Sequence, residues 1–235
     1  MRVLIVQHDH VSPPGPVAER FVQRGFEVVE LVVVPPERFS EPNVHFEFPD
    51  PAEYDALVPM GAPWGAWDDA TIGNWLGPEL EWLRRADAEG VPVLGICFGG
   101  QLLARVHGGS VARAPRPEIG WASIWTDRPD IVSAGPWFQF HYDRWTVPPG
   151  ALEIARNSLA SQAFVLRRNL AVQFHPEITP SSLDGWMSNG GRDLIAADGQ
   201  DPDVLLDHLH AEAAAVAERA HELVDAFLDH VAAND

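Results

Sequence analysis

Short apolar runs alternate with amphipathic segments along the first half of the chain. The runs are typical of buried strands, and the segments between them carry apolar residues at helical spacing and end at glycine. The pattern predicts strands over 2–8, 26–34, 55–59 and 91–96 and helices over 16–24, 74–89 and 101–106, with a long surface loop over 35–51. Because strands that alternate with helices form βαβ units, we expect an α/β fold: a mostly parallel central sheet with helices on both faces.

The pattern changes after the glycines at 108 and 109. Short strands are predicted around 119–126, 137–147, 152–157 and 163–167, and we expect them to extend the sheet with antiparallel pairs. Residues 203–233 form an amphipathic helical stretch whose acidic side is expected to face solvent, with a homodimer or partner contact as the alternative. Since no shift in composition divides the chain, we expect a single domain over 1–235 with a helical C-terminal extension from about 203.

The only cysteine lies where a predicted strand turns into a helix. Cys97 is flanked by Gly95 and Gly99, which keep side chains away from a tight turn. This is the layout of a nucleophile elbow, and the nearby helix N-terminus favours the thiolate form. A buried structural cysteine is the alternative for a lone cysteine, but the flanking glycines favour the reactive one.

A second candidate group follows an apolar strand over 170–174. Pro176 biases His175 toward an extended backbone, in which residues two apart share a face. His175 and Glu177 can therefore turn toward one site as a base and the carboxylate that orients it. His-Pro-Glu alone would more often be a surface turn, but together with Cys97 it completes a Cys-His-Glu triad.

Four segments give the chain a family resemblance that spans about residues 1–190. They are Gly95–Gln101, Val172–Glu177, Met60–Pro63 and Phe140–Asp143. With these motifs the chain resembles the class I (triad) glutamine amidotransferases, in particular free-standing proteins similar to the glutaminase domain of GMP synthase. The resemblance implies a flavodoxin-like sheet with an antiparallel extension.

The resemblance also implies the roles of individual residues. Cys97 would attack a γ-glutamyl carbonyl, His175 would transfer the proton, and Glu177 would hold the imidazole. The backbone N–H groups of Phe98 and of the Gly61–Ala62 turn would form the oxyanion hole.

A glutamine-binding pocket is implied as well, formed by Gln101, Phe140, His141 and Tyr142. Ala62 and Tyr142 depart from the family pattern, which has glycine at both positions in many members. If Tyr142 and Trp64 or Trp67 contact the group beyond the γ-carbonyl, γ-glutamyl amides of larger amines should be better substrates than glutamine.

Composition excludes several classes of function. All 16 basic residues are arginine, so neither a P-loop lysine nor a Schiff-base lysine exists, and no Gly-x-Gly-x-x-Gly follows the first strand. A net charge of −18 argues against nucleic-acid binding. The apolar run over 3–6 is too short for a signal peptide or membrane span, and a single cysteine is compatible with a reducing cytoplasm. We expect a cytoplasmic enzyme without a cofactor.

Two other features have a structural and a functional interpretation. His8 and His10 flank Asp9 after the first strand, but this arrangement is a poor metal site, so we expect no metal there and leave open that these residues line the active-site mouth. Tryptophans lie next to the motifs, at Trp64, Trp67, Trp137 and Trp145. Core packing is the expected role of these tryptophans, with contacts at the entrance as the alternative.

The sequence therefore predicts hydrolysis of a γ-glutamyl amide, glutamine or a γ-glutamyl amine, through a Cys97 thioester. In one version the chain is a glutaminase that passes ammonia to a separate synthase subunit. In the other it is a free-standing γ-glutamyl amide or peptide hydrolase without such a partner. A non-catalytic scaffold protein is the third alternative, and the intact triad argues against it.

Overall fold

A computed structural model describes residues 1–233 of the chain. Its central feature is an eight-stranded sheet. In spatial order, the strands are β2 (Glu27–Val32), β1 (Arg2–Gln7), β3 (Ala56–Pro59), β4 (Val93–Ile96), β10 (Asn169–Val172), β9 (Ser161–Leu166), β8 (Leu152–Arg156) and β6 (Trp125–Thr126). The strands from β2 to β10 are parallel, and β9, β8 and β6 add antiparallel pairs at one edge. The mostly parallel sheet with an antiparallel extension is therefore confirmed.

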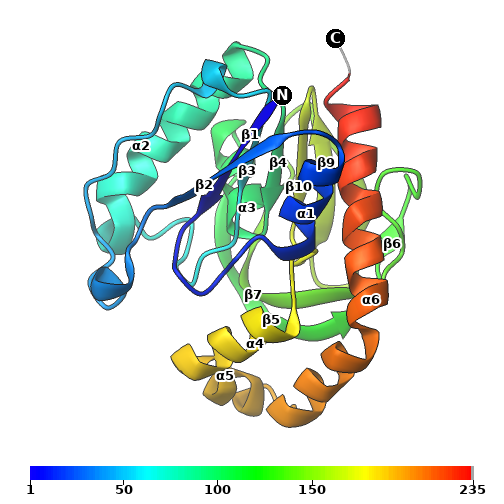
Figure 1. Ribbon diagram of the computed structural model, residues 1–235. Helices are drawn as coiled ribbons and strands as arrows, with labels where there is room; N and C mark the ends of the chain where they lie inside the picture. The colour runs from blue at the N-terminus through cyan, green and yellow to red at the C-terminus, as the bar shows by residue number, and fades with distance from the viewer. Residues whose placement is uncertain (234–235) are drawn as a thin grey trace.

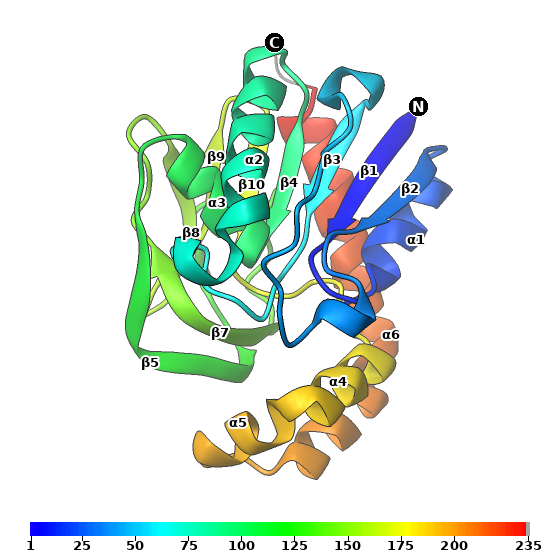
Figure 2. The same cartoon turned by 90° about the vertical axis from the view of Figure 1, so that its left-hand side faces the viewer.

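Helices cover both faces of this sheet (Figures 1 and 2). On one face lie α1 (Gly15–Gln23) and α6 (Pro202–Ala226), and on the other α2 (Asp69–Ala88) and α3 (Phe98–Val106). Strand β1 shows why both faces are apolar: Val3 and Ile5 enter the core under α1 and α6, whereas Leu4 and Val6 enter the core under α2 and α3.

One predicted strand pairs differently from our expectation. We expected residues 137–147 to extend the main sheet, but β7 (Trp137–Trp145) pairs with β5 (Val111–Ala122) in a separate two-stranded antiparallel sheet. The predicted strand over 119–126 is also split, because its first residues end β5 and its last two form β6. The start of β5 gave no strand signal, since arginines and prolines interrupt it between Arg113 and Glu118, where the register also shifts.

A helical layer covers β7, and only its last part, the start of α6, was predicted from the sequence. It consists of α4 (Pro180–Trp186), a kink over Met187–Gly191 where Asn189 and Gly190 have non-helical backbone angles, α5 (Arg192–Ala197) and the first turns of α6. Apolar side chains of these helices pack against β7 in a third core around Phe138, Leu183 and Leu209. In Figures 1 and 2 the layer lies beyond one end of the main sheet, beside β5 and β7. It therefore borders the edge at which the parallel strands end.

The remaining helix boundaries follow from local hydrogen bonds. Helix α2 begins five residues before the predicted start at 74, because the Asp68 carboxylate accepts from the Thr71 N–H and caps the helix. The predicted surface loop lies between β2 and β3. It contains two short 3-10 turns, Pro36–Arg38 and Pro51–Glu53, and packs on α2. The C-terminal helix begins at Pro202 behind an Asp201 cap and continues through a π-helical turn, Phe227–Val231.

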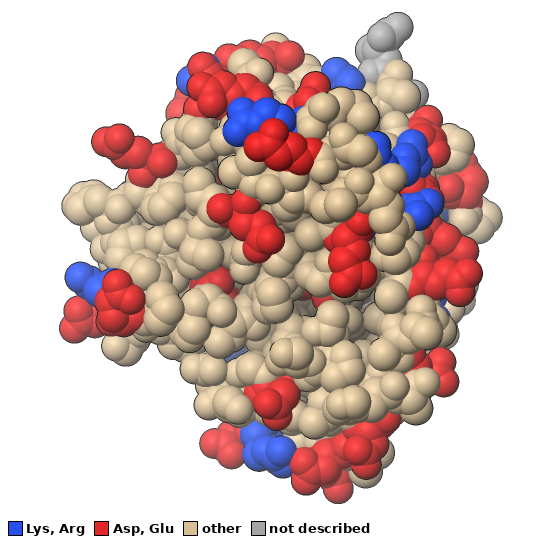
Figure 3. All heavy atoms as spheres, viewed as in Figure 1, with Lys and Arg blue, Asp and Glu red and all other residues tan. Residues whose placement is uncertain are grey.

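Two further properties of the described residues concern helix hydropathy and surface charge. Within residues 1–233, none of the helices combines the length and the apolar character needed to cross a bilayer. On the face shown in Figure 3, acidic side chains are widely spread, and the described part of this face has no large basic patch.

Candidate active site

Cys97 lies in the strained turn that the sequence predicts. Strand β4 ends at Ile96 and α3 begins at Phe98, so Cys97 is the single residue between them, with φ 50° and ψ −102°. A non-glycine residue with positive φ costs about 1–3 kcal/mol and persists only where its surroundings hold it. Here the Cys97 N–H donates to the Val172 carbonyl at 2.8 Å, which ties the turn to β10.

The two flanking glycines are required by close contacts. A Cβ atom on Gly99 would lie 2.0 Å from the Pro59 carbonyl oxygen, and one on Gly95 would lie 2.7 Å from the Gly99 carbonyl. Neither position therefore accepts a side chain without displacing β3 or α3, and the elbow depends on both glycines.

His175 and Glu177 lie beside Cys97 because their strand is the neighbour of β4. Strands β10 and β4 pair in parallel, with Val172 opposite Ile96, so both chains leave the sheet at the same edge. The imidazole Nδ1 of His175 is 2.7 Å from Glu177 Oε1, and both side chains are buried. Because Glu177 accepts the proton of Nδ1, the other ring nitrogen, Nε2, is left to exchange a proton at Cys97.

The electrostatics of His175 favour an ion pair with the thiol. Burial by itself would lower the pKa of His175, but the charges of Glu177 and of a Cys97 thiolate, with their hydrogen bonds, outweigh burial and raise this pKa well above its ordinary value. The thiolate is the form of cysteine that acts as a nucleophile, so a charged His175 ring beside Cys97 suits this pair to nucleophilic attack.

The Gly61 turn, which follows β3, lies directly over this pair. A Cβ atom on Gly61 would lie 3.0 Å from the His175 ring and 3.8 Å from Cys97 Cβ. The next residue, Ala62, is not among the described non-glycine residues with positive φ, which are Cys97 and Arg167. The departure from glycine at position 62 therefore adds no backbone strain.

A buried histidine that we had weighed as a metal ligand holds this turn instead. His8 is fully buried; its Nδ1 lies 3.0 Å from the Gly61 carbonyl and its Nε2 lies 3.0 Å from Glu79. Burial alone would lower the pKa of His8, but the Glu79 charge and hydrogen bond outweigh it and raise the pKa. Both neighbours are acceptors, so the charged ring donates to both. Among the described residues, no group of three or more metal-ligating side chains is suitably arranged.

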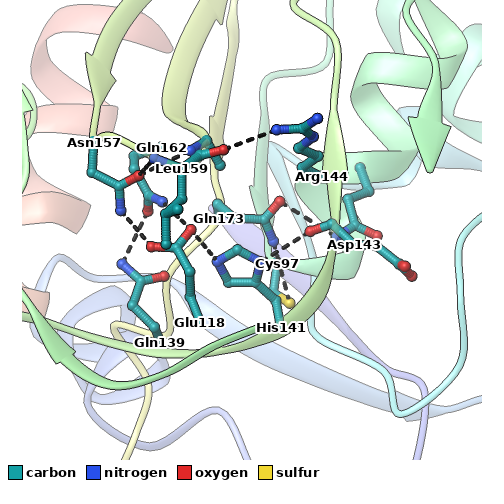
Figure 4. Close-up of polar contacts among 12 residues, drawn as sticks. Cys97, Glu118, Gln139, His141, Asp143, Arg144, Asn157, Leu159, Gln162 and Gln173 are labelled. Atoms are coloured by element: carbon teal, nitrogen blue, oxygen red, sulfur yellow. Dashed lines mark hydrogen bonds and ion pairs between the residues drawn. The ribbon is translucent and has the colours of Figure 1, made fainter. Parts of the chain in front are cut away.

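A pocket opens on the Cys97 side of the pair, and we call it the Cys97 pocket. Its lining includes Ala62, Pro63, Trp64, Cys97, Gln101, Arg113, Phe140, Tyr142, Asp143 and Leu194. Gln101 donates to Gln173 at 3.4 Å. The Gln173 amide lies 3.6 Å from the Cys97 sulfur (Figure 4). Gln101, Phe140 and Tyr142, three residues of the implied glutamine pocket, all line the Cys97 pocket.

His141 lines the same pocket, but its ring belongs to a buried polar cluster. Its Nδ1 donates to the Asp143 carbonyl at 2.9 Å, and its Nε2 lies 3.2 Å from Glu118 (Figure 4). Burial raises the pKa of Glu118, but hydrogen bonds from His141, Asn157 and Gln162 and the charge of His141 outweigh it and lower the pKa. Both ring nitrogens are therefore engaged away from Cys97, which favours His175 as the base.

A second pocket opens on the His175 side, and we call it the His175 pocket. It is lined by Asp9, Val11, Ser12, Phe39, Gly61, Ala62, Pro63, Phe140, His175, Trp186, Asn189, Gly191 and Leu194. The Trp186 ring meets the His175 ring edge to face, with 4.9 Å between the ring centroids. We did not predict Trp186 or Leu194 as site residues, because the segment over 180–197 carries no motif.

The tryptophans that we had singled out divide between core and site. Trp137 stacks on Phe174 and Trp145 contacts Phe164 edge on, both in the core, as packing predicts. Trp64 lines the Cys97 pocket. Trp67 is 44% exposed and lines neither pocket.

Comparison with known proteins links this geometry to a family. The family model of class-I glutamine amidotransferases matches residues 18–190. One subunit of the glutamine-hydrolysing GMP synthase of Sulfurisphaera tokodaii is 34% identical over 136 residues, which cover 54% of this chain and 69% of that protein. The GMP synthase of Aeropyrum pernix is 35% identical over 132 residues, but these cover 48% of this chain and only 26% of the synthase.

Solved structures agree on the fold. The crystal structure of a glutamine amidotransferase from Methylobacillus flagellatus superimposes with a TM-score of 0.81 at 26% identity, covering 98% of this chain and 95% of that protein. Since the family model spans most of the chain and the sheet topology agrees with it, the chain belongs to the class-I glutamine amidotransferase family.

Proposed function

We propose that this enzyme hydrolyses γ-glutamyl amides through a thioester on Cys97. The Cys97 thiolate attacks the γ-carbonyl carbon and forms the S–C bond. His175 donates its Nε2 proton to the amide nitrogen, the C–N bond breaks, and ammonia or an amine leaves. Water then loses a proton to His175, its oxygen bonds to the acyl carbon, and the C–S bond breaks. The products are glutamate, after its acid ionises, and the restored thiolate–imidazolium pair.

The oxyanion of each tetrahedral intermediate requires preorganised donors. We propose the backbone N–H of Phe98, at the N-terminus of α3, and an N–H of the Gly61–Ala62 turn. The closeness of Gly61 to both His175 and Cys97 supports this assignment. The bond from His8 to the Gly61 carbonyl would hold this turn still during the reaction.

The Cys97 pocket carries groups that are complementary to the amino-acid end of the substrate. Arg113 lies over the Tyr142 ring, 4.7 Å from its centroid, and offers a cation for an α-carboxylate. Asp143 Oδ1 is buried and has no hydrogen-bond partner among the described residues, so it offers an acceptor for an α-ammonium group. We propose that these two groups and Gln101 bind the zwitterionic end.

The observation that carries the proposal is the convergence of three elements on one point. Cys97 is held in a strained conformation at the strand end, the 2.7 Å His175–Glu177 pair lies on the neighbouring strand, and Gly61 lies over both. A structural cysteine in a core needs none of these features.

Labelling with a glutamine-like diazo-ketone tests this assignment directly. We expect a stoichiometric adduct that peptide mapping places on Cys97, with glutamine protecting against it and with no adduct in Cys97→Ser. An adduct on another residue, or an equal adduct in the variant, would refute Cys97 as the nucleophile.

Supply of ammonia to a separate synthase is a second candidate function. It is favoured by the similarity to the GMP synthase subunit of Sulfurisphaera tokodaii, which matches over 69% of its length. The chain spans only about a quarter of the full-length synthases such as that of Aeropyrum pernix. A chain with this function should prefer glutamine over all bulkier γ-glutamyl amides.

A further inference from the structure

The two pockets lie on either side of the reacting pair. Cys97 lines only the Cys97 pocket and His175 lines only the His175 pocket, while Ala62, Phe140 and Leu194 are among the residues that line both. The two spaces therefore adjoin across the point where Gly61 covers the catalytic side chains.

The positions of the two pockets determine which end of the substrate enters each of them. The carbonyl carbon must meet the Cys97 sulfur, and the amide nitrogen must meet the proton on His175 Nε2. The glutamyl part consequently extends into the Cys97 pocket, where Arg113 and Asp143 supply charge. Whatever is attached to the amide nitrogen extends into the His175 pocket.

The walls of the His175 pocket are more elaborate than ammonia requires. Phe39, Phe140 and Trp186 are aromatic, and Val11 and Leu194 add aliphatic surface. The pocket encloses about 100 Å³ and is open to solvent. An engineered cavity of about 150 Å³ holds benzene, so an open pocket of this size is suited to a single ring or a short alkyl chain.

A hydrogen-bonded chain fixes the aromatic wall in place. Trp186 Nε1 donates to Ser12 Oγ at 3.1 Å, and Ser12 Oγ donates to Asp9 Oδ2 at 3.0 Å. The other Asp9 oxygen accepts from the Val11 N–H at 2.7 Å. Trp186 is thereby held against His175 before any substrate arrives, which lowers the entropic cost of binding an apolar group there.

The charges of this pocket select against an acidic substituent. Its lining contains no arginine, and its one carboxylate, Asp9, is 2% exposed. The one cation in this lining, the His175 ring, is already paired with Glu177 and faces Cys97. The α-carboxylate of a γ-glutamyl amino acid would therefore enter this pocket without a free cation to pair with, and close to Asp9. Burying an unpaired charge is costly, so such substrates should be poor.

We propose that the His175 pocket is a binding site for an apolar, uncharged amine substituent, and that γ-glutamyl amides of such amines are preferred over glutamine and over γ-glutamyl amino acids. This inference rests on the proposed function and names its substrate class. It also assigns substrate selection to different residues from those that we expected. Tyr142 and Trp64, which we had expected beside the leaving group, line the Cys97 pocket instead.

The test compares glutamine, γ-glutamyl benzylamide and γ-glutamyl-phenylalanine with the purified enzyme. The last two share a phenyl ring, and γ-glutamyl-phenylalanine carries in addition an α-carboxylate and one more carbon between the nitrogen and the ring. We expect kcat/KM for the benzylamide to exceed that for glutamine by roughly 10- to 100-fold, because a buried apolar group discriminates to about this extent. The value for γ-glutamyl-phenylalanine should be at least about tenfold below that for the benzylamide.

Variants assign the preference to the pocket. Phe39→Ala, which removes a wall of the His175 pocket alone, should lower the benzylamide-to-glutamine ratio of kcat/KM by roughly tenfold. Tyr142→Gly in the Cys97 pocket is the matched control and should affect both substrates equally, leaving the ratio unchanged. Phe39→Leu keeps an apolar wall and should retain most of the ratio, which separates lost contact from impaired folding.

The kinetic results can contradict the apolar amine site without contradicting hydrolysis through Cys97. Cys97-dependent turnover with glutamine equal to or better than the benzylamide overturns the apolar amine site and supports the ammonia-supplying function. A ratio that Phe39→Ala leaves unchanged overturns the assignment to the His175 pocket. Absence of Cys97-dependent turnover for all three substrates overturns the proposed function itself.

Discussion

Cys97→Ala is expected to lower kcat for glutamine by at least about 10⁴-fold, because no other group in the site can form the acyl-enzyme. Alanine keeps the Cβ and the backbone N–H of Cys97, so the elbow with φ 50° keeps its tie to the Val172 carbonyl. Release of glutamate measures the loss, and the melting temperature of the variant reports on folding. Activity within tenfold of the parent in a folded variant would contradict nucleophilic catalysis by Cys97.

His175→Ala is expected to reduce kcat by about 10³- to 10⁴-fold, and Glu177→Gln by about 10- to 100-fold. The first change removes the imidazole, which takes the thiol proton and later protonates the leaving nitrogen. The second leaves the proton donor in place and removes the carboxylate 2.7 Å from its Nδ1. Equal and small losses in both variants would mean that another base serves Cys97, although the His141 ring is engaged with Glu118 and the Asp143 carbonyl.

The pH profile of Glu177→Gln tests whether the charge of Glu177, and not only its hydrogen bond, acts on His175. Glu177 raises the pKa of His175, so its neutral replacement should lower that pKa. The imidazolium would then lose its proton at lower pH, and the alkaline limb of kcat/KM should move to lower pH in Glu177→Gln. An alkaline limb that stays in place, or moves upward, would show that the Glu177 charge does not act on the reacting group.

The parallel part of the sheet could be predicted largely because β1, β3, β4 and β10 are short apolar runs, and because Gly25 and Gly90 end the helices that precede β2 and β4. The elbow was visible for a similar reason, since Gly95, Cys97 and Gly99 are adjacent in sequence and the close contacts that demand glycine are local. Strand β5 was missed at its start because its partner β7 lies outside the main sheet and its exposed residues include Arg113 and Arg116. A strand that is half exposed and interrupted by proline carries no apolar run.

The residues that were missed act through contacts distant in sequence. Trp186 reaches His175 only because α4 folds over the end of the sheet, and its bond to Ser12 spans 174 positions. Glu79 pairs with His8 across 71 positions. One signal for this pair was available, because Glu79 interrupts the apolar face of α2 between Trp75 and Leu83. A carboxylate at such a position needs a buried partner.

The thioester is the central claim, and trapping it with hydroxylamine is the most direct measurement. When glutamine is turned over in the presence of hydroxylamine, the nucleophile should divert the acyl group, so that γ-glutamyl hydroxamate forms at the expense of glutamate while ammonia release continues. The hydroxamate should be absent with Cys97→Ala. Wild-type enzyme that releases glutamate and ammonia but forms no hydroxamate at any hydroxylamine concentration would contradict a Cys97 acyl-enzyme.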